Sequence, residues 1–172
     1  MMTQEEVRAL LVKTGAIMDG HFLLTSGLHS PHYVEKFKDA NIETVVGPVT
    51  GGILLAHETG KSLGTRAIFT ERVDGKMTFR RGFSLREGER VLIVEDIVTT
   101  GGSIKEVIDV VKAAGAVPVA VSMLVDRSGG KANFGDVPST ALLTMEVETD
   151  TPESCPLCAK GIPMTKRGRT GK

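Results

Sequence analysis

From residue 44 onward, short apolar runs alternate with stretches of helical pattern. The runs are rich in β-branched residues and are followed by glycine-rich or polar turns, which is typical of buried strands. They lie at 44–46, 66–70, 91–94, 117–125 and 141–147, with helices expected through Leu63 and from about Ser103 to Ala114. Apolar strands alternating with helices predict an α/β fold with a mainly parallel central sheet flanked by helices.

The N-terminal segment has a different pattern. Thr3 and Glu6 form a capping box ahead of an apolar stripe that ends at Gly15, which predicts a first helix. Two short extended segments, 21–24 and 32–36, are separated by a turn containing glycine and proline. The length of 172 residues, without a repeat of fixed period, suits a single domain.

Segment 72–90 is polar and basic. Asp74 and Gly75 favour a hairpin turn within it. Because the segment is short of apolar anchors, we expect an exposed, mobile loop, with Met77 and Phe79 as closure contacts at most.

Composition and charge narrow the classes of function. Hydrophobic residues make up 41% of the chain, which is enough for a core, and the formal net charge is +0. Bulk electrostatics therefore favour neither nucleic acid nor a membrane surface as a partner. The polar start is unlike a secretory leader and no run approaches a membrane span, so a cytoplasmic protein is expected. A phosphorylated substrate would have to be held by local features.

The strongest local feature is the end of the apolar run at 91–94. Two carboxylates, Glu95 and Asp96, follow it directly, and a hydroxyl- and glycine-rich turn at 99–103 opens the next helix. Such a turn suits a phosphate, which the helix dipole also favours. The acids would repel that phosphate unless they served sugar hydroxyls, so a phosphorylated pentose fits both halves. The pattern lacks a Walker lysine and a GxGxxG fingerprint.

A second glycine-rich turn lies at 47–52, also between a strand and a helix. By itself it is compatible with a simple packing turn. Two anion sites flanking a diol site describe 5-phosphoribosyl-1-pyrophosphate, with the basic loop closing over the pyrophosphate. The loop residues available for this are Arg72, Lys76, Arg80 and Arg81.

The stretch from Val94 to Ser103 resembles the phosphoribosyl-pyrophosphate motif of type I phosphoribosyltransferases. Three further segments are similar to orotate phosphoribosyltransferases within that family. They are the base-binding hood at 20–31, the arginine-containing segment 125–130 and the cysteine-containing tail 155–163. The resemblance implies the type I phosphoribosyltransferase fold, with a hood at about 1–38, a core at about 39–150 and a tail at about 151–172.

The resemblance also implies roles for individual residues. Arg72 and Lys76 are the expected catalytic residues of the flexible loop, and Arg127 is expected to pair with the carboxylate or a ring carbonyl of orotate. The other expected substrate-binding residues are Glu95 and Asp96 for the ribose hydroxyls, Thr99, Thr100, Gly101, Gly102 and Ser103 for the 5′-phosphate, and Thr50 and Gly51 in the second turn. Mg²⁺ bound mainly through the pyrophosphate, and a homodimer whose loop acts across the interface, are implied as well. No residue is assigned as a metal ligand.

The sequence departs from the family pattern at three basic residues and at one helix. Several well-known members have a lysine at the position of Thr25, another in the turn that holds Thr50 and Gly51, and a histidine in the catalytic loop. None of the three stands here. The chain also passes almost directly from Phe37 to Asp39, where members usually place a helix of several turns.

The cysteines, three of the histidines and the C-terminal residues give weaker indications of function. Cys155 and Cys158 are expected to be reduced thiols, since a zinc site usually takes four ligands. His21, His29 and His32 are expected to be hydrogen-bonding residues near the base site rather than catalysts. The basic, glycine-rich residues 160–172 are expected to form a poorly ordered tail.

The implied reaction joins orotate to the ribose C1 carbon of 5-phosphoribosyl-1-pyrophosphate and releases pyrophosphate. The product is orotidine 5′-monophosphate, an intermediate of pyrimidine biosynthesis. Two alternatives remain open at this point: a phosphoribosyltransferase for a purine or another base, and a non-catalytic nucleotide-sensing regulator of the same fold. An intact acidic pair and a long basic loop favour an enzyme over a sensor.

Overall fold

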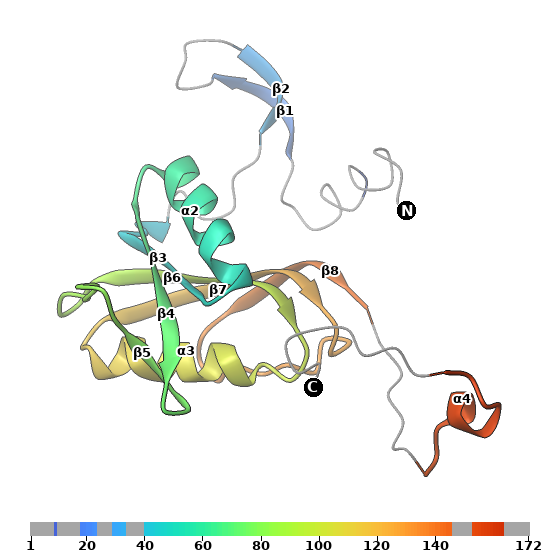
Figure 1. Cartoon of the computed structure of the whole chain (residues 1–172). Helices are drawn as coiled ribbons and strands as arrows, with labels where there is room; N and C mark the ends of the chain where they lie inside the picture. The colour runs from blue at the N-terminus through green and yellow to red at the C-terminus, as the bar shows by residue number, and fades with distance from the viewer. Residues whose placement is uncertain (1–8, 10–17, 24–28, 34–39, 146–152, 164–172) are drawn as a thin grey trace.

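The computed structural model describes residue 9 and residues 18–23, 29–33, 40–145 and 153–163. Figure 1 shows the elements as they lie along the chain. They are β1 (Met18–Leu23), β2 (His29–Tyr33), β3 (Thr44–Pro48), α2 (Gly51–Leu63), β4 (Arg66–Val73), β5 (Lys76–Phe79), β6 (Arg90–Val98), α3 (Gly102–Ala113), β7 (Val117–Asp126), β8 (Ser139–Thr144) and α4 (Pro156–Ala159).

Six of these strands form one sheet in the order β5-β4-β3-β6-β7-β8. The strands β3, β4, β6, β7 and β8 run parallel, and β5 pairs antiparallel with β4 at one edge. The predicted mainly parallel sheet is therefore confirmed. β1 and β2 pair with each other in a separate antiparallel sheet, close to the two extended segments expected from the sequence.

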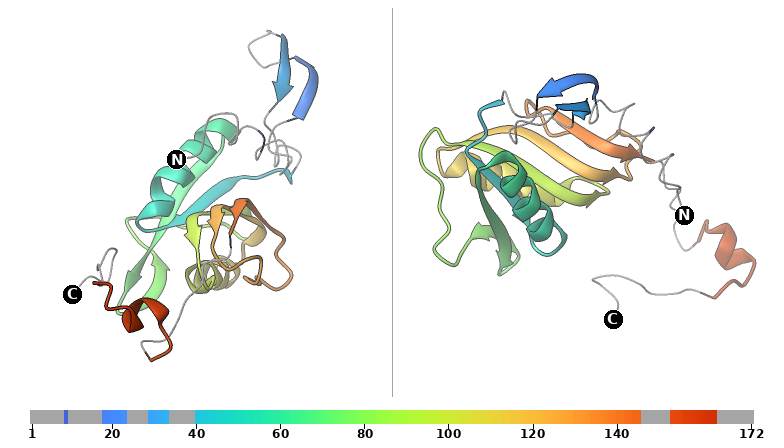
Figure 2. Two further views of the ribbon diagram at one scale, coloured as in Figure 1. Left: turned by 90° about the vertical axis from the view of Figure 1, so that its right-hand side faces the viewer. Right: turned by 90° about the horizontal axis from the view of Figure 1, so that it is seen from above.

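The helices α2 and α3 cover opposite faces of the sheet (Figures 1 and 2). Because successive side chains of a strand point to opposite faces, β6 contributes to both cores. Val91 and Ile93 belong to the core on the α3 side, whereas Leu92 and Val94 belong to the core on the α2 side. All four are nearly inaccessible to solvent, which explains why the sequence shows a continuous apolar run rather than an alternating one.

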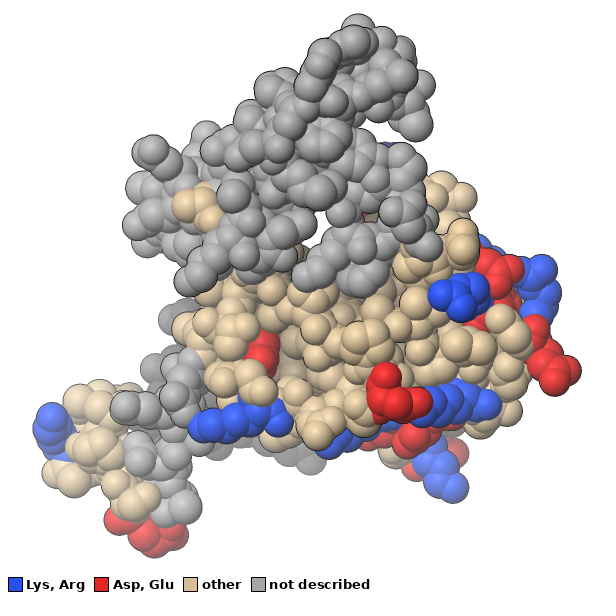
Figure 3. Space-filling model, turned by 180° about the vertical axis from the view of Figure 1, so that it is seen from behind, with Lys and Arg blue, Asp and Glu red and all other residues tan. Residues whose placement is uncertain are grey.

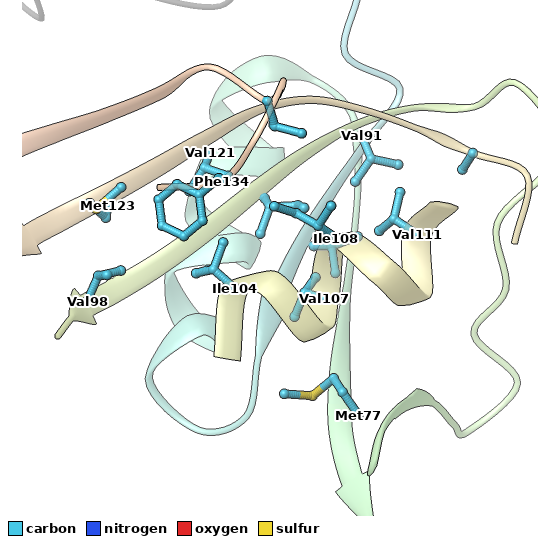
Figure 4. Close-up of a cluster of buried hydrophobic side chains, with 14 of the residues drawn as sticks. Met77, Val91, Val98, Ile104, Val107, Ile108, Val111, Val121, Met123 and Phe134 are labelled. Carbon is cyan, nitrogen blue, oxygen red and sulfur yellow. The ribbon is translucent and has the colours of Figure 1, made fainter. Parts of the chain in front are cut away.

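The larger core lies between α3 and the sheet (Figure 4). Ile104, Val107, Ile108 and Val111 place one stripe of α3 in it, at the spacing of one helix face. This packing fixes the first turn of α3 relative to the carboxyl end of β6.

The segment after β4 corrects one expectation from the sequence. Asp74 and Gly75 both have positive φ, as the predicted hairpin turn between β4 and β5 requires. Met77, however, is only 8% exposed and belongs to the larger core, and Phe79 packs against it. The prediction that the segment lacks buried anchors, with these two residues as closure contacts at most, was wrong, because side chains on one face of β5 reach the core beside α3.

A buried carboxylate lies at the opposite, N-terminal edge of the sheet. Glu89 precedes β6 and accepts hydrogen bonds from the Thr44 hydroxyl, from Nη2 of Arg66 at 3.0 Å and from the backbone N–H of Arg86 at 2.7 Å. Burial alone would raise the pKa of Glu89, but these hydrogen bonds and the two guanidinium groups outweigh it and lower that pKa. The cluster joins the starts of β3, β4 and β6.

Charges elsewhere on the surface are mixed in sign. On the face shown in Figure 3, the coloured lysine and arginine side chains lie near aspartate and glutamate side chains. In the part of the chain that the structure describes, no helix is both long enough and apolar enough to cross a membrane.

The remaining expectations about segments fall partly outside the described residues. The first helix lies there apart from Ala9, which is helical, as does most of the junction near Phe37. Residues 164–172 of the expected tail also lie there. The division into hood, core and tail stays a prediction.

Candidate active site

Two glycine-rich turns lie at the carboxyl edge of the sheet, one after β3 and one after β6. The first leads into α2 from Thr50, and the second leads into α3 from Gly101. Neither N-cap residue, Thr50 or Gly101, gives a side-chain hydrogen bond to its helix, and in α3 the N–H of Gly102 donates to the Thr100 hydroxyl at 3.4 Å. N–H groups at the start of a helix favour an anion, so both turns are suited to phosphate groups.

The turn after β6 encloses a small hollow of about 60 Å³. Its lining consists of Glu95, Ile97, Val98, Thr99, Thr100, Gly101, Gly102, Ser103 and Ile104. Gly101 has φ +79°, and a Cβ there would lie 2.9 Å from the Phe134 ring, so both conformation and space call for glycine. The structure thus brings together six of the residues predicted to hold the pentose and its phosphate.

Asp96 faces the other turn. The strand β6 continues through Val98, so Glu95 and Asp96 are adjacent strand residues and point to opposite faces. Glu95 lines the hollow, whereas the Asp96 carboxylate lies against Gly51, where an added Cβ would be 2.0 Å from Oδ2. Each of the two turns therefore has one carboxylate beside it.

Arg127 lies at the same edge of the sheet, next to the hollow. It follows β7, and its backbone N–H donates to the carbonyl of Val98 at 2.8 Å. Its side chain is exposed. A cation at this place could meet a base attached to the sugar whose phosphate occupies the hollow.

Comparison with known proteins agrees with this geometry. A family model described as phosphoribosyl transferase domain matches residues 32–136. The chain is 50% identical over 187 aligned positions to an orotate phosphoribosyltransferase of Desulforamulus reducens, with 97% of each chain covered. The chain belongs to the orotate phosphoribosyltransferase family. The alignment has more positions than the 172 residues of the chain, so the relative contains residues with no counterpart here.

Solved structures show the same fold. An adenine phosphoribosyltransferase of Rhodothermus marinus matches with a TM-score of 0.53 and 22% identity, over 63% of this chain and 73% of that chain. An orotate phosphoribosyltransferase of Mycobacterium tuberculosis matches with a TM-score of 0.51 and 20% identity, over 81% of this chain and 95% of that chain. Because proteins that differ in the named base share this fold, the fold alone does not select a base.

The basic residues of segment 72–90 differ in what they contact. Arg72 donates to Oε1 of Glu106 at 2.8 Å, and Arg81 donates to Glu71 at 3.1 Å. Lys76 stands at the start of β5, beside the hairpin turn, and is exposed, without an ion-pair partner among the described residues. Of the two cations predicted to be catalytic, Lys76 is available as it stands, whereas Arg72 would have to leave Glu106.

Arg72 and Glu106 connect the hairpin to the phosphate turn, since Glu106 lies one helical turn after Ser103 on α3. The contact joins one nitrogen to one oxygen, and both side chains are about 40% exposed (40% and 38%). The second oxygen of Glu106 is buried, and no described residue donates a hydrogen bond to it. Sequence reasoning missed Glu106, because a glutamate on a solvated helix face carries no distinguishing signal.

The described residues include no group of three or more histidine, cysteine, aspartate or glutamate side chains that could hold a metal ion. The carboxylates of Glu95 and Asp96 lie beside the two turns. Carboxylate oxygens fit Mg²⁺, which in phosphate-binding sites is commonly held by one or two carboxylates together with substrate phosphates. The donor set of the site is therefore compatible with a Mg²⁺ ion that arrives with its substrate.

The two cysteines lie outside this site. Cys155 precedes α4 and Cys158 lies within it, and the two do not form a disulfide with each other. A hydrogen bond with Cys155 and its charge raise the pKa of the Cys158 thiol. His21, His29 and His32 lie in β1 and β2, whose side chains are not among those the structure describes.

Proposed function

We propose that the protein transfers the 5-phosphoribosyl group from 5-phosphoribosyl-1-pyrophosphate to orotate, giving orotidine 5′-monophosphate and pyrophosphate in pyrimidine biosynthesis. The observation that carries this proposal is the hollow in which Glu95 and the start of α3 lie together. High identity to a named orotate phosphoribosyltransferase over nearly the whole chain supports the choice of base.

The hollow accounts for the sugar-phosphate half of the substrate. Backbone N–H groups and hydroxyls of the turn at 99–103 would hold the 5′-phosphate, with the dipole of α3 favouring its charge. Glu95 would accept hydrogen bonds from the ribose hydroxyls, which offer donors that a phosphate lacks. Asp96 would take part from the neighbouring face of β6, beside Thr50 and Gly51 in the second turn.

Charge separation at C1 explains why the site needs both carboxylates and cationic side chains. As the bond to pyrophosphate breaks, the leaving group gains negative charge and the ribose ring gains positive, oxocarbenium-like character. Lys76 and Arg72 would stabilise the leaving pyrophosphate, and the carboxylates would tolerate the cationic ring. Closure of the hairpin would keep water away from the reactive carbon.

Mg²⁺ would be held mainly by the pyrophosphate, with Asp96 and Glu95 as the nearby oxygen donors. When bound, it supplies positive charge that offsets the charge of the departing pyrophosphate. Orotate already carries an ionised carboxylate and an acidic ring, so the chain needs no strong general base. Arg127 would pair with the orotate carboxylate or a ring carbonyl through its directed N–H donors.

The expected assembly is a homodimer in the cytoplasm, with segment 72–90 of one protomer acting at the site of its partner. An exposed hairpin that carries Lys76 beside its turn, with no ion-pair partner among the described residues, suits such a role. Analytical ultracentrifugation tests the dimer, and mixing Lys76→Ala with Asp96→Asn protomers tests the sharing of sites. If sites are shared, the mixed dimers regain activity that neither variant has alone.

The activity is tested by pyrophosphate release from 5-phosphoribosyl-1-pyrophosphate and Mg²⁺ with orotate, uracil, adenine and hypoxanthine in turn. Release with orotate alone, together with formation of orotidine 5′-monophosphate, is the expected result. Preference for a purine would overturn the choice of base. Binding of 5-phosphoribosyl-1-pyrophosphate without turnover of any base would instead favour a nucleotide-sensing regulator.

A further inference from the structure

Another buried carboxylate lies directly beside Arg127. Asp126 is the last residue of β7 and is only 6% exposed. An ionised carboxylate is costly to bury unless several donors satisfy it. Neither the phosphate turn nor the proposed chemistry uses this group, so its hydrogen bonds indicate what it does.

Among the described residues, the donors to the Asp126 carboxylate all lie in the loop after β7. Oδ1 accepts from the backbone N–H of Ser128 at 2.8 Å and from its hydroxyl at 2.6 Å, and Oδ2 accepts from the N–H of Gly130 at 3.0 Å. The Ser128 hydroxyl in turn accepts from the N–H of Ala132 at 2.8 Å. Arg127 is thus enclosed in a turn whose backbone is fixed at several points by one side chain.

The same loop is tied to the rest of the site. The N–H of Arg127 donates to the carbonyl of Val98, a residue that lines the hollow, and the Phe134 ring lies against Gly101 in the phosphate turn. Phe134 is 6% exposed, so this contact is part of the core rather than a loose surface contact. The position of the loop is therefore defined relative to the place where the sugar phosphate would lie.

Asp126 remains charged in this setting. Burial alone would raise its pKa, but the hydrogen bonds from Ser128 and Gly130 outweigh burial and hold the pKa below its ordinary value. An anion next to Arg127 could also attract the guanidinium group. In the structure the carboxylate oxygens are instead occupied by the loop backbone and Ser128, and the Arg127 side chain is exposed.

We propose that Asp126 is a positioning residue for base recognition: by fixing the backbone of 127–130 it aims Arg127 at the acidic group of the base. This inference rests on the proposed function and adds a determinant of selectivity to it. Asp126 would not touch the substrate. Its contribution would be to keep the guanidinium in one place, so that little conformational freedom is lost when orotate binds.

Asp126→Asn tests the proposal by replacing one oxygen of the carboxylate with an NH₂ group. The amide keeps the acceptor for Ser128, but its NH₂ group would face the N–H of Gly130, so donor meets donor. We expect KM for orotate to rise about tenfold and the preference for orotate over uracil to fall by a similar factor, because a hydrogen bond to a charged acceptor is lost. KM for 5-phosphoribosyl-1-pyrophosphate should stay within about twofold.

Asp136→Asn is the matched control. Asp136 precedes β8, its side chain is 82% exposed and it pairs with Lys112, so the same chemical change occurs near the loop without touching the turn at 127–130. Its kinetics should equal those of the wild type. Equal effects of the two substitutions would assign the change to surface charge and overturn the proposal.

Ser128→Ala provides a second test that leaves the carboxylate in place. It removes the hydroxyl that bridges Asp126 and the N–H of Ala132, and it should raise KM for orotate by about threefold with the same loss of preference over uracil. If Asp126→Asn does not fold, this variant decides the question. If the wild type is active with orotate but the variants keep its selectivity, the inference about Asp126 is wrong and the proposed function stands. If the wild type is inactive with orotate, the proposed function is wrong.

Discussion

The carboxylate of Asp96 lies directly over Gly51, so closely that a methyl group at that glycine would fall 2.0 Å from Oδ2. This contact joins the strand of the acidic pair to the turn before α2. It explains why the second turn needs glycine at this position, although φ at Gly51 is not in the left-handed region. The contact leads to the first prediction.

Gly51→Ala should displace the Asp96 carboxylate and weaken binding of 5-phosphoribosyl-1-pyrophosphate about tenfold, which corresponds to about 1.4 kcal/mol. Calorimetry measures this affinity directly. Leu54→Ala, at a 75% exposed position on the same helix, is the control and should bind normally. Wild-type affinity in the Gly51 variant would show that Asp96 does not contribute to the site.

Asp96→Asn should weaken the same binding, because the amide is a poorer acceptor for ribose hydroxyls and a poorer ligand for Mg²⁺. Combined with Gly51→Ala, it should have much less than its single effect, since both changes act on one carboxylate. Additive losses in calorimetry would mean that the two residues act separately.

Lys76→Ala should lower kcat about a hundredfold with a much smaller rise in KM, because its charge would act on the pyrophosphate as it leaves. Steady-state kinetics separate the two constants. Arg81→Ala is a suitable control, since Arg81 is paired with Glu71 and lies 5.9 Å from the centre of the Phe69 ring. Unchanged turnover in the Lys76 variant would remove Lys76 from catalysis.

Glu106→Gln should release Arg72 and lower KM for 5-phosphoribosyl-1-pyrophosphate by about two- to fivefold, the range expected for one partly exposed ion pair. The effect should vanish when Arg72 is replaced by alanine, because no pair then remains to be broken. Glu71→Gln removes an ion pair from the same hairpin and should leave KM unchanged. A raised KM in the Glu106 variant would mean that the contact supports catalysis instead of competing with it.

Glu89→Gln should reduce the free energy of unfolding by about 2–3 kcal/mol. The substitution removes a buried anion that accepts a hydrogen bond from the Thr44 hydroxyl and forms ion pairs with Arg66 and Arg86. Since folding lowers the pKa of Glu89, the carboxylate stabilises the fold fully above the ordinary value of 4.5. That contribution is lost as the pH falls through the lower, folded-state pKa. Urea denaturation at several pH values should show wild type and variant converging in acid.

Glu87→Gln is the control for this stability measurement, since Glu87 is exposed in the same loop. It should denature at the urea concentration of the wild type. A constant difference between Glu89→Gln and wild type down to the most acidic pH would contradict the assignment of the effect to ionisation.

The sequence by itself determined the main strands and helices of the core and indicated where a candidate site lies. Buried parallel strands must be continuously apolar and must end at one edge, so the run before Glu95 and the turn up to Ser103 predicted both the sheet and its ligand-binding edge. The helical pattern through Leu63 and the turn propensity of Asp74 and Gly75 likewise predicted a helix and a hairpin turn.

Tertiary structure decided which distant groups meet. Asp126, Glu89 and Glu106 are ordinary acids in the sequence, and only packing shows which donors surround each of them. Met77 became a core residue because the β5 strand reaches the packed side of α3, a relation that periodicity within four residues cannot show. Local patterns fix periodicity and turn chemistry, whereas contacts across long stretches of chain depend on how the faces pack.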